Sequence, residues 1–281
     1  MSIKDITVVI TSFKSDEKLK NCLNSIDRQC KVIIVENSNN LEFKKNFEQK
    51  FNNVECILTG ENLGYGKGNN IGLKKVRTKY ALILNPDALL AESTLENFTK
   101  AAELIPDFAI MAPHKQDKKN EIRENVKENF YPQLVKNVKG FAMFLNLSEF
   151  KEIGFFDENF FLYFEDIDLC RQLVNHNKKI YLISNIKINH LGAQSSDKLI
   201  NKERELTRNW HWMWSTFYYH KKYKGFFISF LIILPKLTSS MIKILIYSML
   251  MNREKKEIYY QRFSGLINAI MGKSSWYRPK L

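Results

Sequence analysis

The segment ITVVITSFKSDEKLKNCLNSIDRQCKVIIVEN (Ile6–Asn37) decides the fold. Its two ends, Ile6–Ser12 and Lys31–Asn37, are β-branched apolar runs bounded by polar residues, which predicts two buried strands. Between them, Asp16–Ile26 places apolar residues at helical spacing. A strand, a helix and a second strand in this order predict a βαβ unit with parallel strands.

The same alternation continues beyond this segment. Val54–Gly60 and Tyr80–Asp87 predict two further strands, and the stretches near 41–51, 69–76 and 93–102 have helical patterns. We therefore predict an α/β fold in which ligands bind beyond the carboxyl ends of parallel strands. The polar side chains that end the strands are expected on that rim, although each also suits a turn or a helix cap. They are Thr11, Ser12, Glu36, Asn37, Asn62, Asn85 and Asp87.

Glycines cluster in NLGYGKGNN, which contains Gly64, Gly66 and Gly68. The spacing matches neither a P-loop nor the dinucleotide fingerprint, which argues against a Rossmann dehydrogenase. Glycines at this density still let the backbone approach a ligand closely. Farther along the chain, Lys139–Leu147 predicts a strand and Lys115–Asn129 predicts a charged, mobile loop.

An aromatic run that ends at Phe164 leads directly into Glu165, Asp166 and Asp168. One interpretation is helix capping, because carboxylates stabilise a helix N-terminus. The other is a general base, because an apolar wall raises the pKa of a carboxyl group and makes its carboxylate a better proton acceptor. Three acids in four residues are more than capping requires.

The tripeptide Asn85-Pro86-Asp87 also has two interpretations. It can form a simple turn. Alternatively, the Asp87 carboxylate can hold Mg²⁺ or Mn²⁺, which favour oxygen ligands and often use one or two carboxylates. His190 is either a second ligand or a structural histidine.

Composition sets the class of protein. The chain has 281 residues and 33.1 kDa, and 44% of its residues are hydrophobic, which predicts a globular protein with a sizeable core. Its four cysteines lack metal-ligand spacing and predict reduced thiols in the cytoplasm. The start MSIKDITVVITSF lacks the features of a secretory signal.

Charge is unevenly distributed along the chain. The 43 Lys and Arg residues exceed the 30 Asp and Glu residues, for a net charge of +13. Residues 201–281 hold 15 of the basic groups and only 4 of the acidic ones. A nearly neutral body with a basic tail argues against nucleic-acid binding and favours contact with an anionic membrane surface.

The start of this tail is aromatic. Trp210, Trp212 and Trp214 precede Phe217 and Tyr218 and are flanked by basic residues. Trp and Tyr favour the membrane interface, which is the preferred interpretation. Stacking on nucleic-acid bases is the alternative.

The apolar stretch Phe226–Leu250 follows and is interrupted by Pro235. We expect a helix that lies in the membrane plane, because a polar stripe with lysines runs along an otherwise apolar helix. Packing on the catalytic domain or on a second subunit, and a true transmembrane span, are the alternatives. The stripe consists of Ser229, Lys236, Ser240 and Lys243.

The motifs VVITSF, VIIVENS, ENLGYGKGNN, LILNPDA, GFFDENFFLYFEDIDLCRQL and NHLGAQSS, in this order, resemble a family 2 inverting glycosyltransferase. The resemblance is strongest to the rhamnosyltransferase-like branch that builds cell-surface polysaccharides, and it covers about residues 4–215. It implies the GT-A fold, a mixed sheet flanked by helices.

The resemblance also implies roles for individual residues. Asp166, with Glu165 beside it, would be the catalytic base, and Asp87 with His190 would hold Mg²⁺ or Mn²⁺. Asn85 stands where the family has the first Asp of its metal-binding D-x-D. The donor nucleotide sugar would be bound by Thr11, Ser12, Glu36, Asn37, Asn62, Gly64, Gly68, Asn69 and Asn85, and the acceptor by Asp157 and Trp210.

We therefore predict a catalytic domain over residues 1–215 and a basic, amphipathic, helical, membrane-associating region over 216–281. The predicted function is inverting transfer of a sugar, with rhamnose a candidate, from a nucleotide-diphosphate sugar to a glycan or lipid-linked glycan. A sugar-phosphate nucleotidyltransferase and an inactive, membrane-associated binding protein of the same fold are the alternatives. The predicted location is the inner face of the cytoplasmic membrane, with a homodimer as a further candidate assembly.

Overall fold

The computed structural model describes residues 2–114, 130–190 and 198–278. The loop predicted over Lys115–Asn129 and the end of the NHLGAQSS motif lie outside these ranges. The chain divides into two compact units. The sheet unit comprises Met1–Phe156 and Asp166–Ala193, and the helical unit comprises Asp157–Glu165 and Gln194–Leu281. The predicted division at residue 215 falls inside the long helix α6 (Lys198–Met249).

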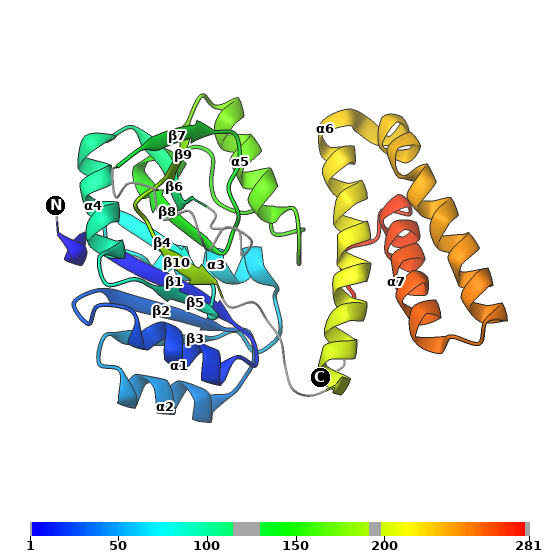
Figure 1. The fold of residues 1–281 in the computed structure, drawn as a ribbon, viewed down its shortest axis with the longest axis horizontal. Helices are drawn as coiled ribbons and strands as arrows, with labels where there is room; N and C mark the ends of the chain where they lie inside the picture. The colour runs from blue at the N-terminus through cyan, green and yellow to red at the C-terminus, as the bar shows by residue number, and fades with distance from the viewer. Residues whose placement is uncertain (1, 115–129, 191–197, 279–281) are drawn as a thin grey trace, which may run out of the picture. The chain divides into compact units, whose positions relative to one another are not determined.

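The sheet unit confirms the predicted α/β architecture (Figure 1). Strands and helices alternate through its first half, as the apolar runs and the helical spacing predict. The strands are β1 (Ile6–Ser12), β2 (Lys31–Glu36), β3 (Val54–Leu58), β4 (Tyr80–Leu84), β5 (Ala88–Leu90), β6 (Phe108–Pro113), β7 (Pro132–Val135), β8 (Ala142–Asn146), β9 (Lys179–Ile183) and β10 (Ile188–His190). The helices are α1 (Asp16–Asn24), α2 (Leu41–Lys50), α3 (Tyr65–Lys75), α4 (Thr94–Leu104) and α5 (Glu165–Asn175), with 3₁₀ turns at Ile3–Asp5 and Leu147–Phe150.

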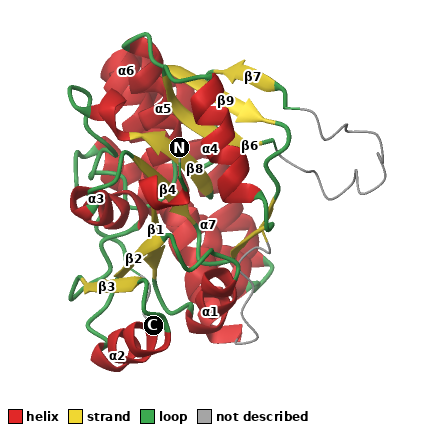
Figure 2. Cartoon of the chain, turned by 90° about the vertical axis from the view of Figure 1, so that its left-hand side faces the viewer, coloured by secondary structure: helices red, strands yellow, loops and turns green. Residues whose placement is uncertain are grey.

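Eight strands form one mixed sheet in the order β3-β2-β1-β4-β8-β6-β9-β7. In Figure 2 the strands can be followed from β3 at one edge of the sheet to β7 at the other. Strands β1 to β4 are parallel, β8 runs antiparallel to both of its neighbours, and β9 is parallel to β6. A separate antiparallel pair joins β5 to β10. Neither β5 nor β10 was expected from the sequence as part of a second, two-stranded sheet.

Helices cover both faces of the large sheet. Side chains at alternate positions of β1 point to opposite faces, so Val8 packs with α1, α2 and α4 whereas Val9 packs with α3 and α5. Strands β1 and β4 are therefore buried almost throughout, as expected for strands that are covered on both faces. The four cysteines are buried free thiols, as the sequence predicts.

The helical unit is built from α6 and α7 (Arg253–Ile270). Gly225 has φ 75° and ψ 172°, which breaks α6 into two helical halves. Gly265 of α7 lies so close to the first half that a Cβ atom there would stand 2.3 Å from the carbonyl oxygen of Trp210. This close approach lets the two helices pack tightly.

The tryptophans of the helical unit do not lie where the sequence interpretation put them. Trp210, Trp214 and Phe217 are at most 3% exposed and form its apolar core with residues of α7. Trp210 donates through Nε1 to the hydroxyl of Ser264 at 3.2 Å. The side chain of Trp212, in contrast, is 41% exposed. The aromatic cluster is therefore mainly a packing core, because helical spacing turns two of the three indoles toward α7.

Candidate active site

The predicted rim exists in the sheet unit. Parallel register pairs Ser12 with Glu36 and Glu36 with Leu58, so β1, β2 and β3 end at the same level. Leu84, the last residue of β4, pairs with Ala142 at the start of β8. The carboxyl ends of the parallel strands and the start of β8 thus share one edge, which is where ligands bind in sheets of this kind.

Five buried polar atoms at this rim lack a hydrogen-bond partner among the described residues: Thr11 Oγ1, Ser12 Oγ, Glu36 Oε2, Asn37 Oδ1 and Asn69 Oδ1. Two of these residues lie beside Gly68, where a Cβ atom would stand 3.0 Å from Thr11 Oγ1 and 3.4 Å from Asn37 Nδ2. Buried polar groups are nearly always hydrogen-bonded in folded proteins. This cluster therefore suits a polar ligand that completes their hydrogen bonds.

Glu36 lies beside this cluster and is only 3% exposed. Burial raises the pKa of its carboxyl group, although the nearby hydroxyls of Ser38 and Ser12 oppose the shift. The Ser38 hydroxyl donates to Oε1 at 3.0 Å. A buried carboxyl group with a free edge suits the hydroxyls of a ribose or the N–H groups of a base.

The glycine segment closes this part of the rim. Gly64 has φ 82°, a left-handed conformation that favours glycine, and α3 begins directly after it. The Gly64 N–H donates to Asn62 Oδ1, and Asn37 Nδ2 donates to the Gly64 carbonyl, both at 3.0 Å. The predicted donor residues Asn37, Asn62, Gly64 and Gly68 are thus brought together.

Asp87 and His190 also meet, although 103 positions separate them in the sequence. The pairing of β5 with β10 sets Ala88 opposite His190, and His190 Nε2 lies 3.1 Å from Asp87 Oδ1. Burial acts to raise the pKa of Asp87, but the hydrogen bond and the charge of His190 outweigh it and hold the pKa below its usual value. The Asn85 amide nitrogen lies 3.5 Å from the same imidazole nitrogen.

The donor set suits a divalent cation that shares its ligands with a substrate. Within the described ranges, no group of three or more His, Cys, Asp and Glu side chains is arranged to hold a metal ion alone. One carboxylate and one imidazole still match the small number of protein ligands that Mg²⁺ and Mn²⁺ take when phosphate oxygens supply the rest. Asp87 and His190 therefore fit a cation that arrives with a diphosphate.

Asp166 is the second residue of α5 and lies at the same edge. Its Oδ2 accepts from the Gly140 N–H at 2.9 Å and its Oδ1 from the Ile167 N–H at 2.8 Å. Burial raises its pKa, and these backbone donors only partly offset that effect. Its neighbour Glu165 is 6% exposed, whereas Asp166 keeps more of its surface accessible. Asp166 therefore has the properties of a general base that is held in a fixed orientation.

The dipeptide Gly140–Phe141 connects these parts of the site. Besides its contact with Asp166, Gly140 accepts a hydrogen bond from the Tyr65 hydroxyl of α3. The Phe141 carbonyl accepts from the Asn85 N–H at 2.8 Å, and the Phe141 ring stacks on His190 at 4.8 Å. Sequence reasoning missed this connection, because a glycine at the start of a strand carries no functional signal.

The two predicted acceptor residues belong to the helical unit and have structural contacts there. Trp210 is fully buried, so the prediction that it contacts an acceptor is wrong. The Asp157 carboxylate accepts from Lys222 Nζ at 2.8 Å and from the Tyr218 hydroxyl at 3.1 Å. It therefore fixes the segment Asp157–Glu165 to α6 rather than standing free for an acceptor.

The segment that precedes α5 is conformationally strained. Tyr163 and Phe164 have φ values of 69° and 71°, which is uncommon for residues other than glycine. Within the helical unit, both rings contact Trp212, and the Ser215 hydroxyl donates to the Leu162 carbonyl at 2.9 Å. These contacts stabilise the turn that leads the chain into Asp166.

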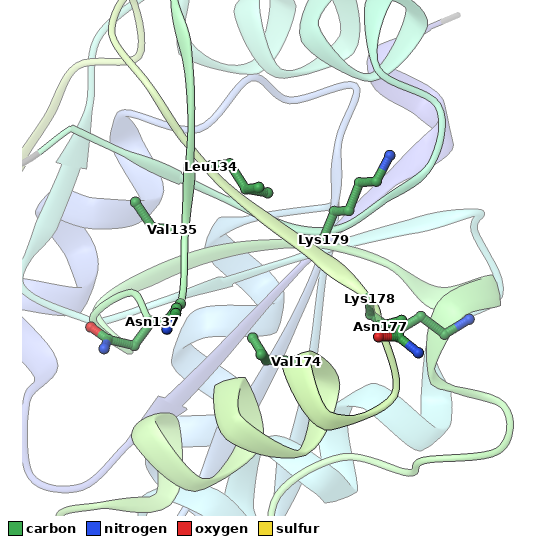
Figure 3. A pocket seen from close by; sticks show the side chains of 8 residues that line it. Leu134, Val135, Asn137, Val174, Asn177, Lys178 and Lys179 are labelled. Carbon is green, nitrogen blue, oxygen red and sulfur yellow. The ribbon is translucent and has the colours of Figure 1, made fainter.

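A pocket of about 640 Å³ lies elsewhere in the sheet unit (Figure 3). It is lined by residues of β7, the end of α5 and the start of β9, among them Leu134, Val174 and Lys179. Strand β9 runs parallel to β6, and Lys179 is its first residue. The pocket therefore lies at the amino end of β9, away from the rim that holds Asp87 and Asp166.

Comparison with known proteins agrees with this geometry. The model of glycosyl transferase family 2 matches residues 7–170. The low-salt glycan biosynthesis hexosyltransferase Agl10 of Haloferax volcanii is 23% identical over 205 residues, a match that covers 63% of this chain and 64% of that protein. Rhamnosyltransferase WbbL of Escherichia coli is 26% identical over 252 residues, covering 76% of this chain and 92% of that protein.

A solved structure shares the fold. The mannosyltransferase PcManGT from Pyrobaculum calidifontis, in complex with GDP-Man and Mn²⁺, superposes with a TM-score of 0.59 at 11% identity and covers 96% of this chain and 88% of that one. At this identity the likeness bears on the fold, and it agrees with the predicted GT-A architecture. Since the family model matches more than half of its length, the chain belongs to glycosyl transferase family 2.

Proposed function

We propose that this chain transfers a sugar, with inversion, from a nucleotide-diphosphate sugar to a glycan or lipid-linked acceptor in cell-surface polysaccharide synthesis. The observation that carries the proposal is the arrangement of one rim around Gly140–Phe141. Asp166, whose carboxyl pKa is raised by burial, lies on one side of this dipeptide, and the pair Asp87 and His190 lies on the other. The buried polar atoms that lack a hydrogen-bond partner lie near the glycine segment.

In this proposal the donor nucleotide occupies the cluster of Thr11, Asn37 and Gly68. Their buried polar atoms would gain hydrogen bonds from the base and ribose, and Gly68 lets α3 pack closely against Thr11 and Asn37. Asp87 and His190 would hold a divalent cation, which neutralises charge on the leaving diphosphate when it is bound. Rhamnose is the first sugar to test, since a relative covering most of the chain is a rhamnosyltransferase.

Asp166 has the role of base. Its carboxylate takes the proton of an acceptor hydroxyl while that oxygen attacks the anomeric carbon. The bond from the anomeric carbon to the diphosphate oxygen breaks, and its electron pair stays on the leaving nucleoside diphosphate. The two backbone N–H groups that bind Asp166 keep its carboxylate oriented, and its raised pKa makes it a stronger proton acceptor.

We also propose that the second half of α6 attaches the enzyme to the cytoplasmic face of the membrane. By length and composition, one helix among the described residues is long and apolar enough to cross a bilayer. Its apolar half begins after the break at Gly225. Large apolar side chains point outward there, including Phe227 at 84%, Leu231 at 66% and Met249 at 80% exposure.

Three of the four residues of the polar stripe point inward, and Lys236 is exposed. Ser229 and Ser240 are at most 2% exposed, and Lys243 Nζ lies 4.8 Å from the centre of the Tyr259 ring of α7. A helix in a water-soluble bundle has the opposite arrangement. Apolar side chains on the outer face and basic groups nearby suit insertion into an anionic bilayer surface.

A donor screen tests the proposed activity. UDP-, dTDP- and GDP-sugars are screened for a rise in melting temperature, because a ligand of the folded state stabilises it. The donor that binds is then incubated with acceptor and Mn²⁺ or Mg²⁺. We expect one nucleoside diphosphate per glycoside formed and an inverted anomeric configuration by NMR. Pyrophosphate release from a sugar phosphate and a nucleoside triphosphate would instead indicate a nucleotidyltransferase, and binding without turnover an inactive protein.

A further inference from the structure

A second, small pocket lies within the helical unit between α6 and α7. It has a volume of about 230 Å³. Two of its lining residues, Lys236 and Arg262, are basic and none is acidic. The remaining lining residues are Met213, Pro235, Ser239, Ser240 and Tyr259. One water takes about 30 Å³ of liquid volume, so the pocket has room for a phosphate group.

The Arg262 guanidinium has unsatisfied hydrogen-bonding capacity. Its Nε is buried and has no hydrogen-bond partner in the part of the chain that the structure describes. The guanidinium lies 5.6 Å from the centre of the Tyr259 ring. Leaving a buried donor unsatisfied costs about 1–3 kcal/mol, and more for a charged group. A guanidinium offers a planar fork of donors that matches the oxygens of a phosphate.

Ser239 and Lys236 present further donors from one face of α6, since they are three positions apart. Hydroxyls of the neighbouring Ser229 and Ser240 donate to the carbonyl four residues earlier, at 2.6 and 2.8 Å. No hydrogen bond or ion pair is found for the Ser239 hydroxyl or Lys236 Nζ within the described ranges. With Arg262, these donors converge on one pocket.

Acidic side chains do not neutralise this pocket. Glu257 of α7 pairs with Lys202 at 2.5 Å, and Glu254 lies in the first turn of the same helix, two turns before Arg262. Lys243 adds a third cation close to Tyr259. The pocket is therefore electropositive, and a phosphate there would meet charge of the opposite sign.

The exposed side chains near the pocket indicate what kind of phosphate compound it would bind. Leu231 and Leu234, at 66% and 38% exposure, precede Pro235 on α6, and Met241 and Ile242, at 49% and 56%, follow Ser240. A free phosphate would use the basic groups and leave these side chains in water. A phosphate attached to a hydrocarbon chain would use both.

We propose that this pocket binds the phosphate group of a lipid. Two sources share this chemistry: the headgroup of an anionic phospholipid and the diphosphate of a lipid-linked glycan acceptor. The site extends the proposed membrane attachment from a diffuse electrostatic contact to a specific one. It needs neither donor binding nor turnover, so its failure is distinguishable from failure of the proposed transferase activity.

The test uses the full-length protein and measures affinity for four probes. They are vesicles of phosphatidylcholine, the same vesicles with phosphatidylglycerol, the same vesicles with a polyprenyl diphosphate, and inorganic pyrophosphate in solution. Arg262→Gln removes the fork, and Ser239→Asp places a carboxylate where a phosphate oxygen would bind. Arg253→Gln, at an exposed position of α7, is the matched control for charge.

We expect Arg262→Gln and Ser239→Asp to weaken binding to the vesicles with phosphatidylglycerol, or to those with the polyprenyl diphosphate, by about tenfold. This is the effect of losing a charge-assisted hydrogen bond. Arg253→Gln should change it by less than about twofold. The vesicle that shows the larger difference identifies the source. Equal losses in Arg262→Gln and Arg253→Gln, with Ser239→Asp at the wild-type level, would overturn the proposal. Pyrophosphate binding as tight as vesicle binding would overturn its lipid part. Unfolding curves for each variant separate these outcomes from misfolding.

Discussion

The sheet unit and the helical unit treat polar groups in different ways. In the sheet unit, apolar side chains fill both faces of the sheet, and unsatisfied polar atoms gather at the rim where the parallel strands end. In the second half of α6, Ser229 and Ser240 are buried, Lys243 lies against Tyr259 of α7, and large apolar side chains face outward. In the proposal, the sheet unit binds a polar ligand in water and the helical unit contacts an apolar surrounding.

This difference indicates which unit carries out each part of the proposed function. Sugar transfer requires carboxylates and hydrogen-bond donors in fixed positions, and the sheet unit supplies them. Attachment to a lipid surface requires exposed apolar area and nearby cations, and the helical unit supplies those. Substitutions in one unit should therefore leave the function of the other nearly unchanged.

A large loss of sugar transfer without loss of vesicle binding is expected for Asp87→Ala. The loss of this carboxylate leaves His190 without its partner at 3.1 Å and removes the main candidate ligand for a cation on the diphosphate. Electrostatic stabilisation of this kind contributes about 2.7–4 kcal/mol, so transfer should fall about 10²–10³-fold while vesicle binding stays constant. Asp107→Ala, which removes an exposed carboxylate of the same unit, is the control. Transfer by Asp87→Ala within twofold of wild type would contradict the role.

Leu231→Glu should have the opposite effect, with a loss of vesicle binding and no loss of sugar transfer. Burying a leucine is worth about 1.5–3 kcal/mol, so the substitution should weaken vesicle binding by about tenfold or more. Transfer to a water-soluble acceptor should persist. Leu104→Glu is a matched control in the sheet unit, because Leu104 and Leu231 are 65% and 66% exposed. Equal vesicle binding by the two variants would show that the outer face of α6 does not contact lipid.

A smaller effect is expected for Gly68→Val, which tests the donor cluster. Its Cβ atom would stand 2.6 Å from Thr11 Cγ2, so the new side chain must displace Thr11, to which the proposal assigns contact with the nucleotide. We predict about tenfold weaker nucleotide affinity by calorimetry, or ~1.4 kcal/mol. Lys67→Ala on the same helix serves as the control. Unchanged affinity in Gly68→Val would place the nucleotide elsewhere.

The smallest effect at neutral pH concerns His211 in the helical unit. Burial lowers its pKa to about 3, while its ring nitrogens contact Ser275 and the Tyr277 carbonyl. Its folded-state pKa lies below the ordinary value of about 6.5, so the unfolded chain binds more protons between these values. Stability from this group is present above pH 6.5 and is lost as the pH falls.

Denaturant unfolding of wild type and His211→Gln checks this pH dependence. Between pH 5 and pH 6, the free energy of unfolding of wild type should rise by about 1 kcal/mol more than that of the variant. The slope is the relevant quantity, because the substitution also removes hydrogen bonds and lowers stability at every pH. Parallel slopes would mean that His211 is protonated in the folded state.

Local sequence patterns predict most of the sheet unit. The β-branched runs that form β1, β2 and β4 leave few alternatives to buried parallel strands, and their polar ends meet at one rim. The short pair β5 and β10 was not predictable, because Ala88–Leu90 pairs with residues about 100 positions later. That pairing brings His190 to Asp87, so their contact could be inferred only from the resemblance.

The packing of the helical unit, in contrast, could not be predicted from local sequence patterns. Its apolar stretch and polar stripe were visible in the sequence, but the stripe alone does not tell which face packs on α7. Trp210 illustrates this, since the same indole suits a membrane interface, an acceptor site or a core. The donors around Arg262 come from two helices, and only their packing places them in one pocket.

The most direct test of the central claim compares Asp166→Asn with wild type in one preparation, measuring kcat for transfer and Kd for the nucleotide. Asparagine keeps the shape and an acceptor oxygen for Gly140 but removes the base. The account predicts that kcat falls about 10²–10⁴-fold, the usual contribution of a positioned base, and that the nucleotide Kd stays within twofold. Near-wild-type kcat in a folded Asp166→Asn protein would contradict it.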